Sequence, residues 1–170
     1  MWNFKGNKRP PFAEIPLPGQ ESVWDYPRPP SLLADSRLVE VISEGQLIAR
    51  SSRTMRVCET ASPPTFYIPP EDIEWDFLVT EAGGSYCEWK GSASYWALKS
   101  KPSCGPVAWS YPRPRASFLR IKDYVAFYPG RVECYVNGER VRPQPGRFYG
   151  GWITDEVVGP FKGAPGTGHW

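Results

Sequence analysis

The chain has almost no histidine: of its 170 residues only His169 is one, and it stands in a Gly-rich tail. Ser-His-Asp and Cys-His sites use a histidine as the base, and a histidine in such a tail is expected to be solvated rather than catalytic. The motifs GxGxxG, GxxxxGKS/T, HExxH and GxSxG are missing too. These absences argue against dinucleotide, P-loop, zinc-protease and serine-hydrolase sites.

An excess of one charge is also missing, because 20 Lys and Arg residues stand against 18 Asp and Glu, for a net charge of +2. This balance predicts no strong attraction to nucleic acid or to an anionic membrane. No apolar run is long enough to span a bilayer, and the segment MWNFKGNKRPPFAEIPLPG has no hydrophobic stretch like that of a signal peptide. We therefore expect a cytoplasmic protein that binds neither nucleic acid nor membrane.

Cysteine is sparse and scattered, at Cys58, Cys87, Cys104 and Cys134, without a CxxC pair. A zinc site would have to gather four distant thiols, so we expect no metal and no cofactor. A disulfide framework is compatible with the count. Free thiols are favoured in a chain without an export signal.

Proline and glycine are abundant instead, with 20 and 16 residues, and 15% of the chain is aromatic. Disordered chains lack aromatic residues, so this combination predicts short strands joined by many fixed turns. We expect a mainly β protein, whose residues 37–142 form a compact antiparallel β domain with one or two short helices. Residues 1–36 and 143–170 are expected to be Pro/Gly-rich arms that wrap this one structural domain.

Periodicity and turn residues place the expected elements. Residues 37–51 predict a β-hairpin around Ser43-Glu44-Gly45, and Asn137-Gly138 predicts the tip of another, because both central residues of a type I′ turn need φ > 0. Residues 92–100 alternate with period two, which predicts a strand with two different faces. Further strands are expected at 65–68, 74–80, 107–111 and within 124–141, and short helices at 52–60 and 115–123.

One phrase occurs almost twice, as VWDYPRPP at 23–30 and as AWSYPRPR at 108–115. Beyond the phrase the two surrounding sequences do not follow each other. We favour two independent loop anchors, in which Trp and Tyr are buried, Pro stiffens the exit and Arg reaches solvent. An internal duplication is the alternative.

The most informative candidate for chemistry is Lys90, which stands directly before Gly91. A glycine at the start of a strand lets another backbone or a ligand approach closely. A lysine among aromatic residues needs an acidic partner, an anionic ligand or a lowered pKa, and Glu59 is its natural partner. The two residues could also form a purely architectural ion pair, and both interpretations stay open.

Cys87 stands three residues before Lys90. As a nucleophile it would need a base or a depressed pKa, and no histidine is at hand, so a packed thiol is favoured over a reactive one. Nearby aromatic residues could line a pocket for a flat or sugar-like ligand, or simply belong to an aromatic core. They are Trp96, Trp109, Tyr111, Phe127 and Tyr128.

Four segments, ETASPPTFYIPPEDI, CEWKGSASYW, AWSYPRP and DYVAFYPGRVE, follow one another within residues 37–136. Together they resemble the signature segments of the domain of unknown function 427 family, and the tail FYGGWIT…VGPFKG…PGT resembles that of longer, cyanobacterial-type members. The segment CEWKG, with Glu88, stands where many members have a proline and an aromatic residue between the Cys and the Lys. The resemblance implies a compact antiparallel β domain, similar to Mss4-like folds, with a polar and aromatic cleft. It implies that this cleft is lined by Glu59, Tyr67, Pro69, Asp72, Cys87, Lys90, Gly91, Tyr95, Trp96, Trp109, Tyr111 and Phe127.

The label nucleotidyltransferase-like, which the family sometimes carries, needs a phosphate-cradling loop beside paired metal-binding carboxylates. No Gly-rich loop stands near Glu74 and Asp76, so we do not adopt it. We expect a protein that binds a small anionic or carbonyl-containing molecule, or a small enzyme using Glu59 and Lys90. The alternative is a non-catalytic module that assembles with itself or another protein through its aromatic arms. On the first view Glu59, Lys90, Tyr95 and Trp109 share one concave surface.

Overall fold

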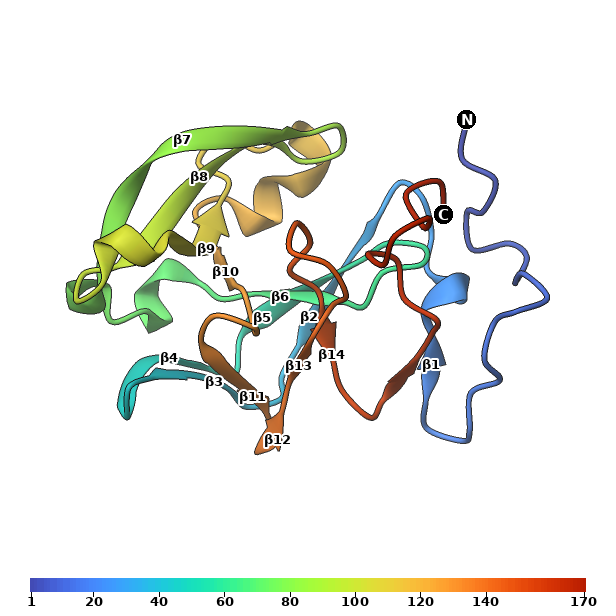
Figure 1. Cartoon of the computed structure of the whole chain (residues 1–170), viewed down its shortest axis with the longest axis horizontal. Coiled ribbons are helices and arrows are strands. Elements are labelled where there is room, and N and C mark those ends of the chain that lie inside the picture. The colour runs from blue at the N-terminus through green and yellow to red at the C-terminus, as the bar shows by residue number, and fades with distance from the viewer.

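The computed structural model describes the whole chain, residues 1–170, as short strands joined by loops and 3-10 turns. The strands form two four-stranded sheets, one three-stranded sheet and two two-stranded ladders (Figure 1). Every strand pairing except that of β1 with β15 is antiparallel, so the expectation of a mainly β fold is confirmed. The strands are β1 (Glu21–Ser22), β2 (Ser31–Asp35), β3 (Val39–Ser43), β4 (Gln46–Ser51), β5 (Thr54–Cys58), β6 (Thr65–Tyr67), β7 (Leu78–Cys87), β8 (Gly91–Leu98), β9 (Pro106–Ser110), β10 (Val125–Phe127), β11 (Glu133–Val136), β12 (Glu139–Arg140), β13 (Arg142–Pro143), β14 (Trp152–Ile153) and β15 (Val157–Val158).

One four-stranded sheet has the order β10-β9-β8-β7 and forms the upper left part of Figure 1. Its longest pairing is the β7–β8 hairpin, which runs from Leu78 opposite Leu98 to Cys87 opposite Gly91. The tight connection between these strands consists of residues 88–90, so Lys90 directly precedes β8. This hairpin therefore fixes where the Lys90 side chain can reach.

The second four-stranded sheet has the order β12-β11-β3-β4 and contains both predicted hairpin turns. Glu44 and Gly45 have φ values of 52° and 76°, and Asn137 and Gly138 have 47° and 81°. Positive φ at both central residues is the type I′ geometry that matches the twist of a hairpin. The predicted hairpins β3–β4 and β11–β12 are confirmed.

The three-stranded sheet, in the order β2-β5-β6, corrects one prediction. Residues 52–60 were expected to form a short helix, but Thr54–Cys58 is the central strand β5. Met55 and Val57 face one buried cluster, while Arg56 points the other way to the Glu21 carboxylate. The alternation and the β-branched residues suit a strand, and pairing on both edges with distant segments outweighs a weak local helix signal.

Two further segments, Trp75–Phe77 and Ala116–Ile121, also differ from expectation. Trp75–Phe77 is a 3-10 turn, so the strand expected at 74–80 begins only at Leu78. Ala116–Ile121 is a kinked 3-10 segment rather than a short α-helix. Phe118 and Ile121 are buried three residues apart, as the period of a 3-10 helix requires, whereas Leu119 is exposed.

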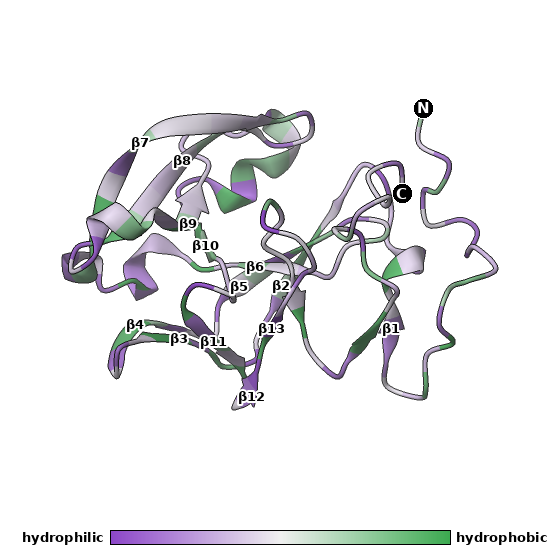
Figure 2. Cartoon of the chain, viewed as in Figure 1, coloured by the Kyte–Doolittle hydropathy of each residue, from purple (hydrophilic) through white to green (hydrophobic).

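Buried apolar residues gather in three clusters. The largest lies between the two four-stranded sheets and includes Ile68, Val125 and Trp152, whose ring stacks on Phe66 at 5.0 Å. A second cluster lies beside it around Tyr67 and includes Trp109, Tyr111 and Phe118. Apolar residues are scattered along many short strands instead of forming a long run (Figure 2). No helix of the protein is both long and apolar enough to pass through a membrane.

Both ends of the chain lie on the same side of the molecule, at the right of Figure 1. The parallel pairing of β1 with β15 joins them. Trp24 makes edge-to-face contacts with Phe4 and Phe12 at 5.3 and 5.4 Å and with Trp170 at 5.3 Å. The aromatic residues of the two terminal segments therefore pack chiefly on each other, in the third cluster.

The two YPRP phrases adopt different local structures. Trp24 lies in the 3-10 turn Val23–Asp25, which leads through a loop into β2. Trp109 lies within β9 and is followed by the kinked segment 116–121. This difference favours independent anchors over an internal duplication. The expectation that the arginine of each phrase reaches solvent holds for Arg113 but is wrong for Arg28, which is buried.

Candidate functional site

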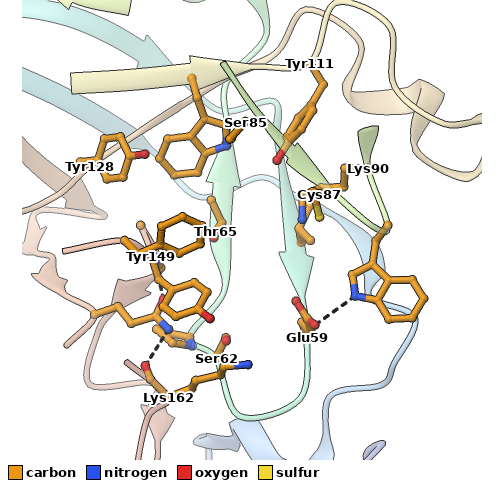
Figure 3. Close-up of a pocket in the computed structure, with 18 of the residues that line it drawn as sticks. Glu59, Ser62, Thr65, Ser85, Cys87, Lys90, Tyr111, Tyr128, Tyr149 and Lys162 are labelled. Atoms are coloured by element: carbon orange, nitrogen blue, oxygen red, sulfur yellow. Dashed lines mark hydrogen bonds between the residues drawn. The ribbon is translucent and has the colours of Figure 1, made fainter. Parts of the chain in front are cut away.

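A cavity of about 620 Å³ lies between the β7–β10 sheet, the ends of β5 and β6, and the C-terminal segment (Figure 3). Small-molecule sites usually have volumes of about 300–1,000 Å³. Eight of the residues named from the sequence line this cavity, although they come from separate parts of the chain. They are Glu59, Tyr67, Cys87, Lys90, Tyr95, Trp109, Tyr111 and Tyr128.

Two of the residues named from the sequence are kept from the cavity by strand alternation. Tyr95 and Trp96 are neighbours in β8, so their side chains lie on opposite faces. Tyr95 lines the cavity, whereas Trp96 packs on Trp75 at 4.7 Å on the other face. In β10 the fully buried Phe127 belongs to the main core while its neighbour Ala126 faces the second cluster. The interpretation of both Trp96 and Phe127 as core residues fits their positions.

Three further residues named from the sequence lie outside the cavity lining. Pro69 and Asp72 belong to the turn after β6, where the Asp72 carboxylate accepts hydrogen bonds from Ser51 Oγ at 2.6 Å and Arg53 Nη2 at 2.9 Å. Gly91 has a φ of 109°, and a Cβ there would lie 3.3 Å from the carbonyl oxygen of Arg113. Gly91 thus lets the β7–β8 connection pass close to residues 113–115, and this close approach positions the neighbouring Lys90. Gly91 itself does not line the cavity.

Lys90 presents an ammonium group to the cavity without an ion pair. The structure contains no salt bridge to Lys90, and its side chain lies over the Tyr111 ring, with Nζ 5.8 Å from the centroid. Its backbone oxygen accepts a hydrogen bond from Arg115 N at 2.9 Å. Burial alone would lower the pKa of Lys90, but the acidic groups of Tyr111, Cys87 and Glu59 outweigh it, so the pKa is raised. Lys90 is therefore charged at neutral pH.

The partner of Glu59 is Arg28 and not Lys90, which corrects the expected pairing. Oε1 of Glu59 accepts hydrogen bonds from Arg28 Nε and from Trp89 Nε1, both at 3.2 Å. Oε2 has no protein donor. Glu59 still lies close enough to Lys90 to help raise its pKa. The carboxylate is thus held in place by other groups. The ammonium of Lys90 has the Cys87 side chain as a hydrogen-bonding neighbour, which leaves hydrogens for another acceptor.

An aromatic wall faces these charges. Trp109 Nε1 donates to the hydroxyl of Tyr67 at 3.1 Å, and the Trp109 ring lies 4.5 Å from that of Tyr128. Burial raises the pKa of Tyr67, and raises that of Tyr128 to about 12, so both hydroxyls stay neutral. The hydroxyl of Tyr95 and Ser85 Oγ lie 2.6 Å apart in a hydrogen bond. The wall is therefore apolar on its faces and keeps neutral donors at its rim.

The C-terminal segment closes one side of the cavity, and sequence reasoning did not predict this. A Cβ at Gly150 would lie 2.3 Å from Trp109 Cη2, and one at Gly151 would lie 2.5 Å from Gln144 Oε1. The chain can pass this close to the aromatic wall only where side chains are missing. The Gly-Gly pair between the aromatic residues of FYGGWI is the sequence signal for this approach.

Two buried cationic side chains, which the sequence did not place at the site, complete the cavity wall. The side chain of Arg28 is 1% exposed and donates to the backbone oxygens of Phe4, Thr60 and Trp170 at 2.8–3.1 Å. Lys162 is 5% exposed, and its only protein acceptor is the Trp170 oxygen at 3.4 Å. Arg28 thus makes four hydrogen bonds from its five N–H donors, whereas the ammonium of Lys162 makes one from three.

Charge in the cavity lining is predominantly positive. Two carboxylates, Glu59 and Glu88, face five cationic side chains. The protein as a whole is close to neutral, so this local excess is a property of the site. The cationic lining residues are Arg28, Lys90, Arg131, Arg147 and Lys162.

No group of three or more His, Cys, Asp or Glu side chains is arranged to hold a metal ion. The search of curated proteins gave no match. A family model described as a domain of unknown function (DUF427) matches residues 31–138, which include the eight expected residues of the cavity and exclude its terminal segments. The chain therefore belongs to the DUF427 family, and in it residues from outside the family domain complete the cavity wall.

Proposed function

We propose that the protein binds a small anionic or carbonyl-containing molecule in this cavity and that the ammonium of Lys90 holds it. The observation that carries the proposal is the unpaired state of Lys90. Its ammonium faces an aromatic-lined cavity, and the nearest candidate partner, Glu59, is engaged by Arg28 and Trp89. A partly buried charge without an ion pair is costly, and an anionic ligand removes that cost.

The surroundings would make such a contact strong. Hydrogen bonds that involve an ionised donor are about twice as strong as neutral ones. The aromatic wall of Tyr67, Trp109 and Tyr111 lowers the local dielectric beside the ammonium. The predominantly positive lining raises the local concentration of anions.

The aromatic wall also indicates the shape of the ligand. The Trp109 and Tyr128 rings pack against each other, and Tyr149 lines the cavity as well. Aromatic faces favour flat or sugar-like molecules, which they contact over a large area. A flat acid or a sugar acid fits both the wall and the ammonium.

Glu59 has a separate role in this proposal. Arg28 and Trp89 hold its Oε1, which leaves Oε2 as the one carboxylate oxygen able to accept a proton or a hydrogen bond from a ligand. A small enzyme at this site would use Glu59 Oε2 as base or orienting group and Lys90 as the electrophilic partner. A chemical step comes second to binding here, because no structural feature favours one reaction over another.

Assembly through the aromatic arms has less support. Phe4, Phe12, Trp24 and Trp170 contact one another within the chain, and Trp2 covers Arg28 at 4.0 Å. These aromatic residues already have partners inside the protein. The arms therefore fit better as parts of the cavity wall than as a surface for another protein.

A thermal-shift screen of carboxylates, phosphates and small carbonyl compounds tests the proposal. We expect at least one class to stabilise the wild type and to lose this effect in Lys90→Met. Lys122→Met, which removes an exposed lysine away from the cavity, is the matched control and should respond like the wild type. Equal stabilisation of wild type and Lys90→Met by every active compound would contradict the proposal.

A further inference from the structure

A second ammonium group reaches the cavity from the opposite end of the sequence. Lys162 follows β15 in the C-terminal segment, whereas Lys90 lies in the β7–β8 connection, and the two labels stand on different sides of the cavity in Figure 3. Neither residue takes part in a salt bridge. The cavity thus contains two separate ammonium groups that form no salt bridge with an Asp or Glu side chain.

Lys162 is held where a free cation is costly. It is 5% exposed, it lies beside the buried Arg28, and Nζ lies 4.4 Å from the centroid of Trp2 and 5.6 Å from that of Tyr149. Burial and the repulsion of Arg28 lower the pKa of Lys162, although Glu59 and Glu88 partly oppose them. Its one hydrogen bond, 3.4 Å long, leaves donors unused. A buried and incompletely bonded ammonium in a cavity wall is an expected place for an acceptor from a ligand.

The backbone holds this position independently of the lysine side chain. Lys162 N donates to the Ala61 oxygen at 2.8 Å, and the Lys162 oxygen accepts from Gln144 Nε2 at 2.7 Å. Gln144 Oε1 in turn accepts from Gly151 N at 3.0 Å. The ammonium is therefore presented by a main chain that has its own hydrogen bonds.

We infer that the ligand has an acidic group at each end of a flat, apolar middle, with one end on Lys90 and the other on Lys162. This inference rests on the proposed function, and it makes the C-terminal segment the part of the protein that distinguishes two acidic ends from one. The aromatic wall of Trp109, Tyr128 and Tyr149 would contact the middle of the molecule. Carboxylates and phosphates both meet this description.

Calorimetric titration with a matched pair of probes tests the inference. Terephthalate has two carboxylates across one ring, and 4-methylbenzoate has a methyl group in place of one of them. We expect terephthalate to bind the wild type on the order of 10- to 100-fold more tightly, as one more hydrogen-bonded charge pair implies. Lys162→Met should remove this advantage and leave 4-methylbenzoate affinity almost unchanged. A third probe, 4-phosphonobenzoate, shows whether one end prefers a phosphonate.

Several results would overturn the inference. Equal affinity of the two probes for the wild type would contradict it, and so would the absence of terephthalate binding. An equal loss of affinity for both probes in Lys162→Met would also contradict it, because it would mean that both lysines hold one anion. A failure of Lys162→Met to fold does not stop the test, because the wild type alone should lose its preference for terephthalate as the pH rises toward the usual lysine pKa of about 10.4. If the wild type binds both probes equally and Lys90→Met loses affinity for both, the inference fails and the proposed function stands. If Lys90→Met binds the probes as tightly as the wild type, the inference and the proposed function both fail.

Discussion

Glu59 and Lys90 line the same cavity, but the carboxylate of Glu59 is hydrogen-bonded to Arg28 and Trp89 and makes no salt bridge with the lysine. Arg28 and Glu59 therefore form the architectural pair, and Lys90 remains the cation without a partner. This division of roles makes different predictions for the two cations.

Arg28→Met should destabilise the fold strongly. The buried guanidinium donates to Glu59 and to the backbone oxygens of Phe4, Thr60 and Trp170, so its loss leaves several acceptors unsatisfied at once. Removing one partner of a buried charge pair costs about 3–5 kcal/mol. Urea denaturation followed by tryptophan fluorescence measures this change in the free energy of unfolding.

Arg9→Met is the control, because the Arg9–Asp25 pair is 42% and 48% exposed. Exposed pairs contribute less than about 1 kcal/mol. Similar losses in Arg28→Met and Arg9→Met would contradict the architectural role of Arg28.

Gly150→Ala should disturb the cavity from the C-terminal side. Its Cβ would lie 2.3 Å from Trp109 Cη2 and 2.7 Å from Cζ3, so the loop or the ring must move. Overpacking of this kind costs about 1–3 kcal/mol. Gly168→Ala, which meets nothing within 4 Å, should stay within about 0.5 kcal/mol of the wild type. The melting temperature and the tryptophan emission maximum report both effects, and an unchanged Gly150→Ala protein would show that the loop does not rest on Trp109.

The four cysteines are unpaired, and their exposure predicts an order of reaction with iodoacetamide. Cys104 is exposed and should react first. Cys58 and Cys134 are buried, and burial raises the pKa of the Cys58 thiol to about 11, so both should react last in the native protein. Cys87 lines the cavity, so a bound anion should slow its modification and leave Cys104 unchanged. Mass spectrometry of timed samples gives the four rates, and faster labelling of Cys58 than of Cys104 would be the wrong order.

The affinity for an acid with two ends should fall as the pH rises. Each lysine binds an anion in its protonated form, and the pKa of Lys162 is lowered whereas that of Lys90 is raised. Lys162 therefore loses its proton below the usual lysine value of about 10.4, before Lys90 does. In calorimetry the preference for terephthalate over 4-methylbenzoate should disappear first, and binding through Lys90 should persist to higher pH. A constant ratio of the two affinities from pH 7 to 10 would argue against this order.

The lowered pKa of Lys162 also predicts how the stability of the free protein depends on pH. Lys162 binds a proton less readily in the folded state than in the unfolded chain, so the unfolded state carries more protons in the window between the two pKa values. Stability from this residue therefore rises with pH through that window, which ends at the unfolded value near 10.4. Lys162→Met should remove this contribution from a series of denaturation curves between pH 8 and 10, unlike Lys122→Met. An identical pH dependence in the two variants would contradict it.

The sequence predicted the fold class and the hairpins because these depend on local features. Asn137-Gly138 can adopt the positive φ that a type I′ turn needs, and the alternation in 92–100 marks a two-faced strand. Residues 52–60 were misread because β5 is defined by its partners β2 and β6, which lie at a distance in the sequence. Pairing between distant segments leaves little trace in a window of nine residues.

The site was predictable where the family segments carry it and not where the terminal segments do. Lys90, Tyr95 and Trp109 stand in recognisable phrases, and all three line the cavity. Arg28 and Lys162 come from Pro/Gly-rich stretches, and only the three-dimensional contacts with Glu59 and Trp2 give them meaning. Trp96 and Phe127 were named with the cavity residues because a phrase does not show which strand face points inward.

A crystal structure of the protein with a stabilising acid from the screen tests the central claim most directly. We predict that an anionic oxygen of the ligand lies within about 3.2 Å of Lys90 Nζ, with the ring or chain of the ligand against Trp109. A ligand bound outside this cavity, or inside it with its acidic groups turned away from Lys90, would contradict the account.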